Sequence, residues 1–311
     1  MSEYIIETKN LTKLFHGKPA VNQIHLRVPQ NSIYGFLGPN GAGKSTTMKM
    51  LLGLSSPDRG SMRIFGQEMN RANRIRILSR MGSLIESPSY YGNLTGYENL
   101  KISCTLRNLP LSEIDEVLKI VRLDGQKNKK TSHYSLGMKQ RLGIANALLG
   151  KPKLLLLDEP TNGLDPAGIH EMRQLIKSLP EKYGITLMVS SHLLAEVEQI
   201  ADQVGIIVKG NIIYQDSLYD LQSKNQRQIL LRTSNDLKSY QILIPAYESL
   251  GQIHSIQQTQ EGLLLPYESD QTLGRHLRLL FDHGIDLYRV EEHCGNLEDI
   301  YLQMVEKEAS L

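Results

Sequence analysis

The segment from residue 38 to residue 46 constrains the fold more than any other part of the chain. It reads Gly-Pro-Asn-Gly-Ala-Gly-Lys-Ser-Thr and fits the pattern G-x-x-x-x-G-K-[ST]. An apolar, strand-like run (Ser32–Leu37) precedes it, and the stretch Lys44–Leu54 has the apolar spacing of a helix. A plain glycine turn before a helix would require neither the lysine nor the serine. The segment therefore predicts a strand–loop–helix unit of an α/β fold.

The chemistry of this segment favours a nucleoside triphosphate as its ligand. Glycines allow the backbone to curl so that several N–H groups point at one phosphate, and the helix N-terminus adds its dipole. Lys44 supplies a cation for the β- and γ-phosphates, and the hydroxyl of Ser45 can ligate Mg²⁺. The predicted nucleotide-binding residues are Gly38, Asn40, Gly41, Gly43, Lys44, Ser45 and Thr46.

A second apolar strand, Leu154–Leu157, ends in the two carboxylates Asp158 and Glu159. Charged residues at the exit of a buried strand are common, but beside a phosphate-binding loop they suggest catalysis. Asp158 is predicted to hold Mg²⁺, and Glu159 to polarise the attacking water as a general base.

Strands and helices alternate along most of the chain, which indicates a parallel sheet covered by helices. Arg71–Arg80 reads as a basic helix, and residues from about 86 to 150 are mostly helical in pattern. The residue composition changes after about residue 222, because residues 223–228 are all polar, as in a linker. Beyond them the order β-α-β-β-α-β, followed by a last helix at 297–308, suggests a ferredoxin-like module. We therefore expect two domains, 1–222 and 223–311.

Composition excludes several classes of protein. Lys plus Arg exceed Asp plus Glu by only two charges, so nucleic acid is not expected as a partner. Two cysteines rule out a disulfide scaffold, and Cys104 lies in an apolar stretch typical of a core residue. No apolar run reaches the length of about 18 residues that a membrane span needs, and the start of the chain does not read as a signal peptide.

With these motifs the chain resembles the ATP-binding subunits of ABC transporters. The resemblance covers residues 3 to about 220. Residues 134–141 (Tyr-Ser-Leu-Gly-Met-Lys-Gln-Arg) are similar to the family's LSGGQ-type signature, with Ser135 placed 23 residues before Asp158. The resemblance implies an ABC-type P-loop NTPase fold, with a mixed sheet core, an antiparallel β subdomain and a helical subdomain at about 86–150. It also implies a homodimer, because the signature of one subunit, through Ser135 and Gly137, closes over the ATP held by the other.

Three further positions follow the order of the family. Residues 162–165 resemble its D-loop, which implies that Asp165 contacts the opposite subunit. His192 resembles the switch histidine, which contacts the γ-phosphate and orients the water. Phe15 stands where the family usually has a tyrosine that stacks on adenine; core packing is the alternative for this side chain.

Two departures from the family pattern stand out. The signature has Tyr134, Leu136 and Met138 where the commonest form has Leu, Gly and Gln. Glu86 stands where the family generally has a glutamine that reaches Mg²⁺ and water while its loop contacts the membrane partner. A glutamate there resembles transporters that give self-protection against lantibiotics and bacitracin-like peptides. Two alternatives remain for Glu86: the glutamate arose by neutral drift, or it is an acidic residue at the start of a helix near Ser87.

Together these features predict an ATPase that uses ATP and Mg²⁺ and lies at the inner, cytoplasmic face of the cell membrane. It would drive a separate integral-membrane permease, with a peptide antibiotic as the indirect substrate. An exporter of another drug or lipid is the main alternative. A soluble ABC ATPase acting on DNA or ribosomes is disfavoured by the single phosphate-binding loop and the lack of heptad runs. A P-loop GTPase is disfavoured because Asn128-Lys129-Lys130-Thr131 lacks the aspartate of the guanine motif N-K-x-D.

Overall fold

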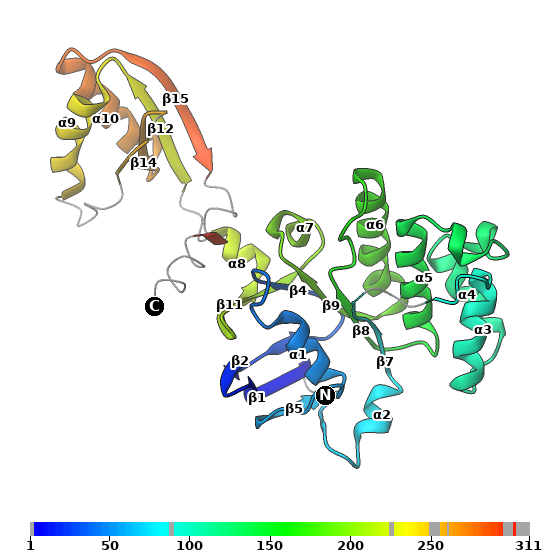
Figure 1. The fold of residues 1–311 in the computed structure, drawn as a ribbon. Coiled ribbons are helices and arrows are strands. Elements are labelled where there is room, and N and C mark those ends of the chain that lie inside the picture. The colour runs from blue at the N-terminus through cyan, green and yellow to red at the C-terminus, as the bar shows by residue number, and fades with distance from the viewer. Residues whose placement is uncertain are drawn as a thin grey trace. The chain divides into compact units, whose positions relative to one another are not determined.

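A six-stranded sheet forms the centre of the first part of the chain (Figure 1). In the computed structural model, which describes residues 3–86, 90–223, 227–248, 256–259, 261–294 and 301–302, its strand order is β11-β10-β4-β9-β8-β7. Neighbouring strands are parallel except β11, which pairs antiparallel with β10. The strands are β4 (Ile33–Leu37), β7 (Met81–Leu84), β8 (Leu154–Asp158), β9 (Thr186–Ser191), β10 (Gln203–Val208) and β11 (Asn211–Ser217).

Every residue of β4 and β9 is buried, so both faces of the sheet are covered. Because β4, β8 and β9 run in parallel, their carboxyl ends meet at one edge of the sheet. That edge is where ligands bind in open α/β sheets. The phosphate-binding loop follows β4, Asp158 is the last residue of β8, and His192 follows β9, so all three lie at these strand ends.

An antiparallel sheet with strand order β2-β1-β5-β6 lies beside this core, and β3 pairs with β1. Its apolar side chains form one cluster with Phe36 of β4, Met48 of α1 and Leu156 of β8. The elements are β1 (Tyr4–Phe15), β2 (Lys18–Ile24), β3 (Arg27–Pro29), α1 (Lys44–Leu51), β5 (Arg59–Ile64), β6 (Gln67–Glu68) and α2 (Arg74–Leu78).

A helical subdomain contains α3 (Gly96–Leu106), α4 (Ser112–Ile120) and α5 (Leu136–Leu148), with short 3₁₀ turns at Asp124–Gln126 and Thr131–His133. The N-terminus of α3 is fixed by a reciprocal capping box, because Thr95 and Glu98 each accept the other's backbone N–H. Cys104, Ile114 and Leu142 join one apolar cluster that also includes Met172 of α6 (Pro166–Tyr183). Cys104 is therefore a core residue, as predicted. The short helix α7 (Leu194–Glu198) follows β9.

The chain divides into two compact units, with the boundary between Leu218 and Tyr219. The second unit has a four-stranded antiparallel sheet of order β13-β14-β12-β15. Its apolar core includes Leu231, Tyr247 and Leu280. Helix α8 (Leu218–Ser223) precedes β12 (Arg227–Thr233), α9 (Asp236–Glu248), β13 (Gln257–Gln258), β14 (Leu263–Pro266), α10 (Asp270–Asp282) and β15 (Leu287–Cys294).

This succession is the predicted β-α-β-β-α-β order. The last helix predicted at 297–308 lies outside the described residues, apart from residues 301–302. None of the helices within the described residues is long and apolar enough to span a bilayer.

Candidate active site

The phosphate-binding loop joins the end of β4 to the start of α1. Gly43 precedes the helix at φ 111°, and a Cβ at this position would lie 2.5 Å from the carbonyl oxygen of Ala20, so only glycine fits. No described group accepts a hydrogen bond from the amides of Gly41 or Gly43. Free amides beside the positive end of a helix form an anion site.

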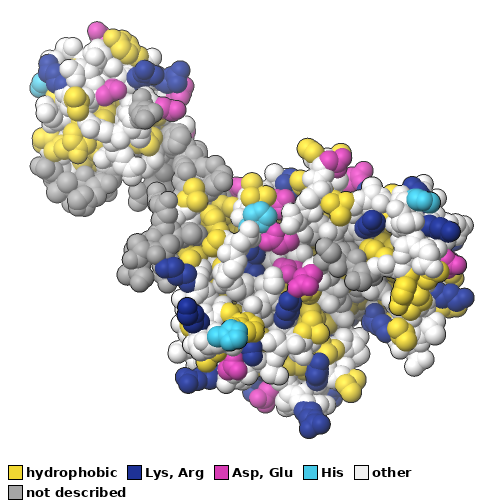
Figure 2. Space-filling view, viewed as in Figure 1, with side chains coloured by type: hydrophobic (Ala, Val, Ile, Leu, Met, Phe, Trp, Pro, Cys, Tyr) yellow, Lys and Arg dark blue, Asp and Glu magenta, His cyan; other side chains and the backbone are white. Residues whose placement is uncertain are grey.

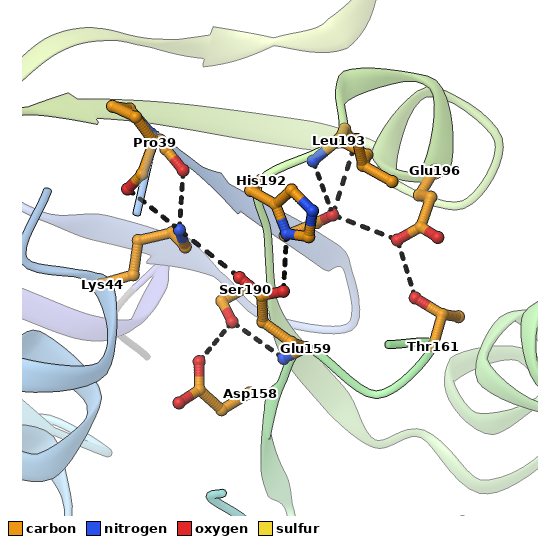
Figure 3. Close-up of polar contacts among 11 residues, drawn as sticks. Pro39, Lys44, Asp158, Glu159, Thr161, Ser190, His192, Leu193 and Glu196 are labelled. Carbon is orange, nitrogen blue, oxygen red and sulfur yellow. Dashed lines mark hydrogen bonds and ion pairs between the residues drawn. The ribbon is translucent and has the colours of Figure 1, made fainter. Parts of the chain in front are cut away.

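Lys44 is turned back into its own loop. Its Nζ donates hydrogen bonds to the carbonyl oxygens of Gly38 (2.6 Å) and Pro39 (3.3 Å), as Figure 3 shows. The side chain is only 6% exposed. Ser45 and Thr46 are half-buried in the first turn of α1, and Asn40 and Gly41 are exposed. The loop therefore presents a buried cation and backbone donors at the same edge of the sheet.

The carboxylate of Glu159 links the phosphate-binding loop to the histidine after β9. Its Oε1 lies 3.5 Å from Nζ of Lys44, and its Oε2 lies 2.6 Å from Nδ1 of His192 (Figure 3). A carboxylate is acceptor-only, so Nδ1 donates and Nε2 is left as the other functional nitrogen. The three predicted catalytic residues, Lys44, Glu159 and His192, are thus brought together.

Asp158 has a different partner, Ser190, which the sequence did not single out as functional. The two residues are paired in register between β8 and β9. The hydroxyl of Ser190 donates to Oδ1 of Asp158 (2.5 Å) and accepts from the backbone N–H of Glu159 (3.0 Å). Ser190 therefore fixes the positions of both acidic residues. The sequence offers one signal for this role, since Ser190 lies near the end of the strand that precedes His192.

A second polar network holds the residues that flank His192 in the sequence. The hydroxyls of Thr161 and Ser191 both donate to Oε2 of Glu196, at 2.7 Å and 3.1 Å. Ser191 also accepts from the backbone N–H of Leu193 (3.0 Å). This network connects the segment after Glu159 to the start of α7, so His192 is held between two fixed points (Figure 3).

The oxygen groups at this edge suit Mg²⁺. A hydroxyl on Ser45 and a carboxylate on Asp158 are hard oxygen donors, and Mg²⁺ typically uses one or two such protein ligands together with waters and substrate phosphates. No group of three or more His, Cys, Asp or Glu side chains forms a metal cage within the described part of the chain. A site completed by a nucleotide is consistent with both observations.

Glu86, the third predicted metal ligand, is placed differently. Its carboxylate forms an ion pair with Lys49 of α1 at 2.6 Å, and its side chain is 67% exposed. The hydrogen bond and the charge of Lys49 lower the pKa of Glu86. Ser45 and Lys49 are four residues apart on α1, so they share a face of the helix one turn apart. Glu86 is therefore paired with a residue that lies one helical turn from Ser45.

Phe15 lies at the end of β1 and is 51% exposed, which excludes the core-packing alternative. Nζ of Lys13 lies 5.7 Å from the centre of its ring. An exposed aromatic ring with a neighbouring cation provides a surface on which a base can stack.

The signature residues lie at the start of α5, where Ser135 is the N-cap and accepts from the amide of Met138 at 3.3 Å. Leu136 lies against the D-loop: its Cδ2 is 3.1 Å from where a Cβ on Gly163 would be. Asp165 caps α6 by accepting from the amide of Gly168 at 2.9 Å. No described hydrogen bond or ion pair joins Ser135, Gly137 or Asp165 to the side chains of Lys44 or Glu159.

The fold and this edge of the sheet define a P-loop ATPase, and comparisons with known proteins give its family. A family model described as ABC transporter matches residues 21–162. The bacitracin transport ATP-binding protein of Bacillus licheniformis is 41% identical over 302 residues, covering 97% of both chains. The lantibiotic transport ATP-binding protein of Streptococcus pyogenes is 43% identical over 229 residues, covering 73% of this chain and 98% of that one.

Solved structures agree with this result. An ATP-binding subunit of an ABC transporter has a TM-score of 0.63 at 29% identity, covering 71% of this chain and 92% of that one. A dimeric bacterial ABC transporter cassette has a TM-score of 0.62 at 25% identity, covering 68% and 98%. The chain belongs to the ATP-binding subunits of ABC transporters and is an ATPase. The predicted fold class is confirmed.

Proposed function

We propose that this protein binds and hydrolyses ATP to power the export, or the removal from the membrane, of a peptide antibiotic through a separate permease. The observation that carries the proposal is the 41% identity to a bacitracin transport ATP-binding protein along 97% of both chains. That match extends beyond the ATPase domain, proposed at 1–222, into the accessory module at 223–311. The lantibiotic relative supports the same class of substrate.

The chemistry is assigned to the residues at the edge of the sheet. Lys44 leaves its contacts with the carbonyls of Gly38 and Pro39 and stabilises the charge that develops on the β- and γ-phosphates. Glu159 accepts a proton from the attacking water, and His192 orients that water and contacts the γ-phosphate. Mg²⁺, held by Ser45, Asp158 and Glu86, would neutralise phosphate charge when bound.

A homodimer with two ATP molecules at its interface is the proposed active unit. Ser135 offers a hydroxyl, Gly137 a backbone N–H and α5 its positive end, and no described hydrogen bond joins them to Lys44 in the phosphate-binding loop of the same chain. A second subunit would bring its signature over that loop, with Asp165 contacting the opposite subunit. The exposed ring of Phe15 would stack on the adenine of the bound ATP, at the end of the nucleotide opposite the phosphates.

The loop that begins at Glu86 is the proposed contact with the permease, which places the protein at the cytoplasmic face of the membrane. The carboxylate of Glu86 is exposed and pairs with Lys49, and it would exchange this partner for the Mg²⁺ of the bound nucleotide. Transport of another drug or a lipid is the second candidate, because ABC relatives with names that state no peptide substrate match the chain over a similar length.

The experiment is a susceptibility assay in a sensitive bacterial host. The gene is expressed with its cognate permease, and growth is measured against bacitracin, a lantibiotic and an unrelated drug. Protection against one of the peptides that depends on both subunits supports the proposal. Protection against the drug alone would favour the second candidate, and no protection at all would contradict peptide export.

Two variants make this assay specific. Glu159→Gln should abolish protection, because the general base is removed while the fold is kept. Glu181→Gln, an exposed carboxylate of α6 outside the site, makes the same chemical change and should leave protection intact.

A further inference from the structure

The surface around helix α2 carries a positive charge that pairs with no carboxylate among the described residues. Residues 69–85 contain four arginines and no acidic residue, whereas the net charge of the whole chain is only +2. All four arginines (Arg71, Arg74, Arg76 and Arg80) are exposed. None of them takes part in an ion pair with another described residue.

The groups that hold these arginines are neutral. Arg74 donates to the carbonyl oxygen of Gly53 at 2.8 Å, and Arg76 donates to the side-chain oxygens of Gln67 (3.0 Å) and Asn73 (3.2 Å). The guanidinium of Arg80 stacks 4.0 Å from the centre of the Phe65 ring. These contacts orient the side chains without cancelling their charge, so the guanidinium groups remain available to an anion.

Two large apolar side chains stand among the arginines. Ile75 is 82% exposed although Ile77, two residues on, is buried against the core. Leu54 is 67% exposed and follows Gly53, whose carbonyl binds Arg74. Figure 2 shows dark-blue side chains at the lower end of the molecule, where Figure 1 places α2. We call this set of residues the α2 surface: Leu54, Arg71, Arg74, Ile75, Arg76 and Arg80.

We propose that the α2 surface binds anionic lipid headgroups at the face of the membrane. Guanidinium groups bind phosphates well, and exposed isoleucine and leucine side chains among them can enter the boundary between headgroups and acyl chains. The low net charge of the whole chain argues against nucleic acid, which would need a broad basic face. An acidic protein is the competing occupant, and capture by purified permease without vesicle binding is the outcome that would favour it.

The position of the surface fits this assignment. The amide of Leu54 donates to the carbonyl oxygen of Lys49, and Lys49 forms the ion pair with Glu86. The α2 surface is therefore linked through Lys49 to Glu86, where the loop that we assign to the permease contact begins, and a permease bound there would bring the α2 surface to the surrounding bilayer. This step alone rests on the proposed function; the charge and the exposed apolar side chains do not depend on it.

The test is vesicle sedimentation of the purified full-length protein without a permease. Vesicles of phosphatidylglycerol mixed with phosphatidylcholine are compared with vesicles of phosphatidylcholine alone. We expect binding to the anionic vesicles, its loss at raised salt, and little binding to the neutral ones. Equal binding to both, or none to either, would overturn the proposal.

Two variants locate the binding on the molecule. Arg71→Gln with Arg76→Gln should weaken the partition coefficient by about 25-fold, at about fivefold per arginine. Ile75→Ser should weaken it by about tenfold and leave the salt dependence unchanged. The control, Lys119→Gln with Arg122→Gln on exposed positions near α4, removes the same charge and should bind as the wild type does.

The remaining outcomes separate the lipid proposal from the proposed function. All variants should retain ATPase activity, which shows that they are folded. Equal loss in the control variant means that only net charge matters, and contradicts a lipid site at α2. Salt-sensitive capture by purified permease without binding to vesicles assigns the surface to a protein and contradicts the lipid proposal. Peptide protection can fail while vesicle binding persists, so the two proposals fail independently.

Discussion

Nδ1 of His192 lies 2.6 Å from Oε2 of Glu159, and Oε1 of the same carboxylate lies 3.5 Å from Nζ of Lys44. The proposed general base is thus held between the histidine and the lysine. Since Lys44 would move to the phosphates when ATP binds, Glu159 would lose one partner and keep the other. The histidine contact then becomes the one that orients the base toward the water.

Ser190→Ala should reduce hydrolysis by about 10- to 100-fold, in line with the usual effect of removing a residue that orients a metal ligand. The serine hydroxyl holds Asp158 and accepts from the amide of Glu159, so its loss frees both acidic residues. Steady-state ATPase assays over a range of Mg²⁺ concentrations measure the effect. The apparent Mg²⁺ requirement should rise, which a purely structural role would not produce.

A suitable control for this change is Ser178→Ala, because that hydroxyl donates only to the carbonyl of Leu175 within α6. Activity and Mg²⁺ requirement should stay at the wild-type values in the control. An unchanged Mg²⁺ requirement in Ser190→Ala would show that Ser190 does not act through Asp158.

Replacing Lys49, the ion-pair partner of Glu86, tests whether Glu86 couples ATP hydrolysis to the permease. Lys49→Gln should leave folding intact, because exposed ion pairs contribute little to the free energy of unfolding. We expect a severalfold change in permease-stimulated ATPase activity and a smaller change in the activity of the subunit alone. Lys49→Arg keeps the charge and should restore the wild-type behaviour; equal effects on both activities would contradict a coupling role for Glu86.

Mixed dimers test the composite nucleotide site. Ser135→Arg and Lys44→Ala should each abolish activity in the pure variant. When the two variants are mixed, each heterodimer contains one intact site, so activity should recover toward about a quarter of the wild-type value. No recovery in heterodimers that are shown to form would mean that each chain completes its own site.

The second unit should be sensitive to pH through His276. Burial lowers the pKa of this imidazole below its ordinary value of 6.5, and its Nδ1 lies 3.2 Å from the hydroxyl of Tyr247. The unfolded chain therefore binds more protons than the folded one below about pH 6.5, so the stability of this unit should fall as the pH drops through that value. Above that pH the histidine is neutral in both states and contributes no pH dependence.

Thermal unfolding near pH 7.5 and near pH 5.5 measures this effect. His276→Gln removes the titrating group, so its unfolding midpoint should fall less between the two conditions than that of the wild type. An equal fall in both proteins would show that other groups cause the pH dependence.

The sequence predicted most of the elements that carry the site, and the reason is local. The phosphate-binding loop and the acidic end of β8 are contiguous segments whose chemistry can be recognised without knowing the fold. The partnership of Asp158 with Ser190 could not be read in this way, since it depends on the register between β8 and β9. The pairing of Glu86 with Lys49 likewise depends on how a loop returns to α1.

The departures in the signature illustrate the same limit. The sequence shows Leu136 only as a leucine where the commonest form of the signature has glycine. In the fold its side chain lies against Gly163 of the D-loop, so it also fills space between two functional segments. Sequence spacing alone does not reveal contacts between segments that are far apart along the chain.

The most direct measurement of the central claim is single-turnover ATP hydrolysis by Glu159→Gln, with nucleotide binding and dimer formation followed in the same samples. We predict that ATP binding is kept, that the rate of hydrolysis falls by about 10²- to 10⁴-fold, and that an ATP-bound dimer accumulates. Glu181→Gln should behave as the wild type does. Hydrolysis by Glu159→Gln at the wild-type rate would contradict the assignment of Glu159 as the general base.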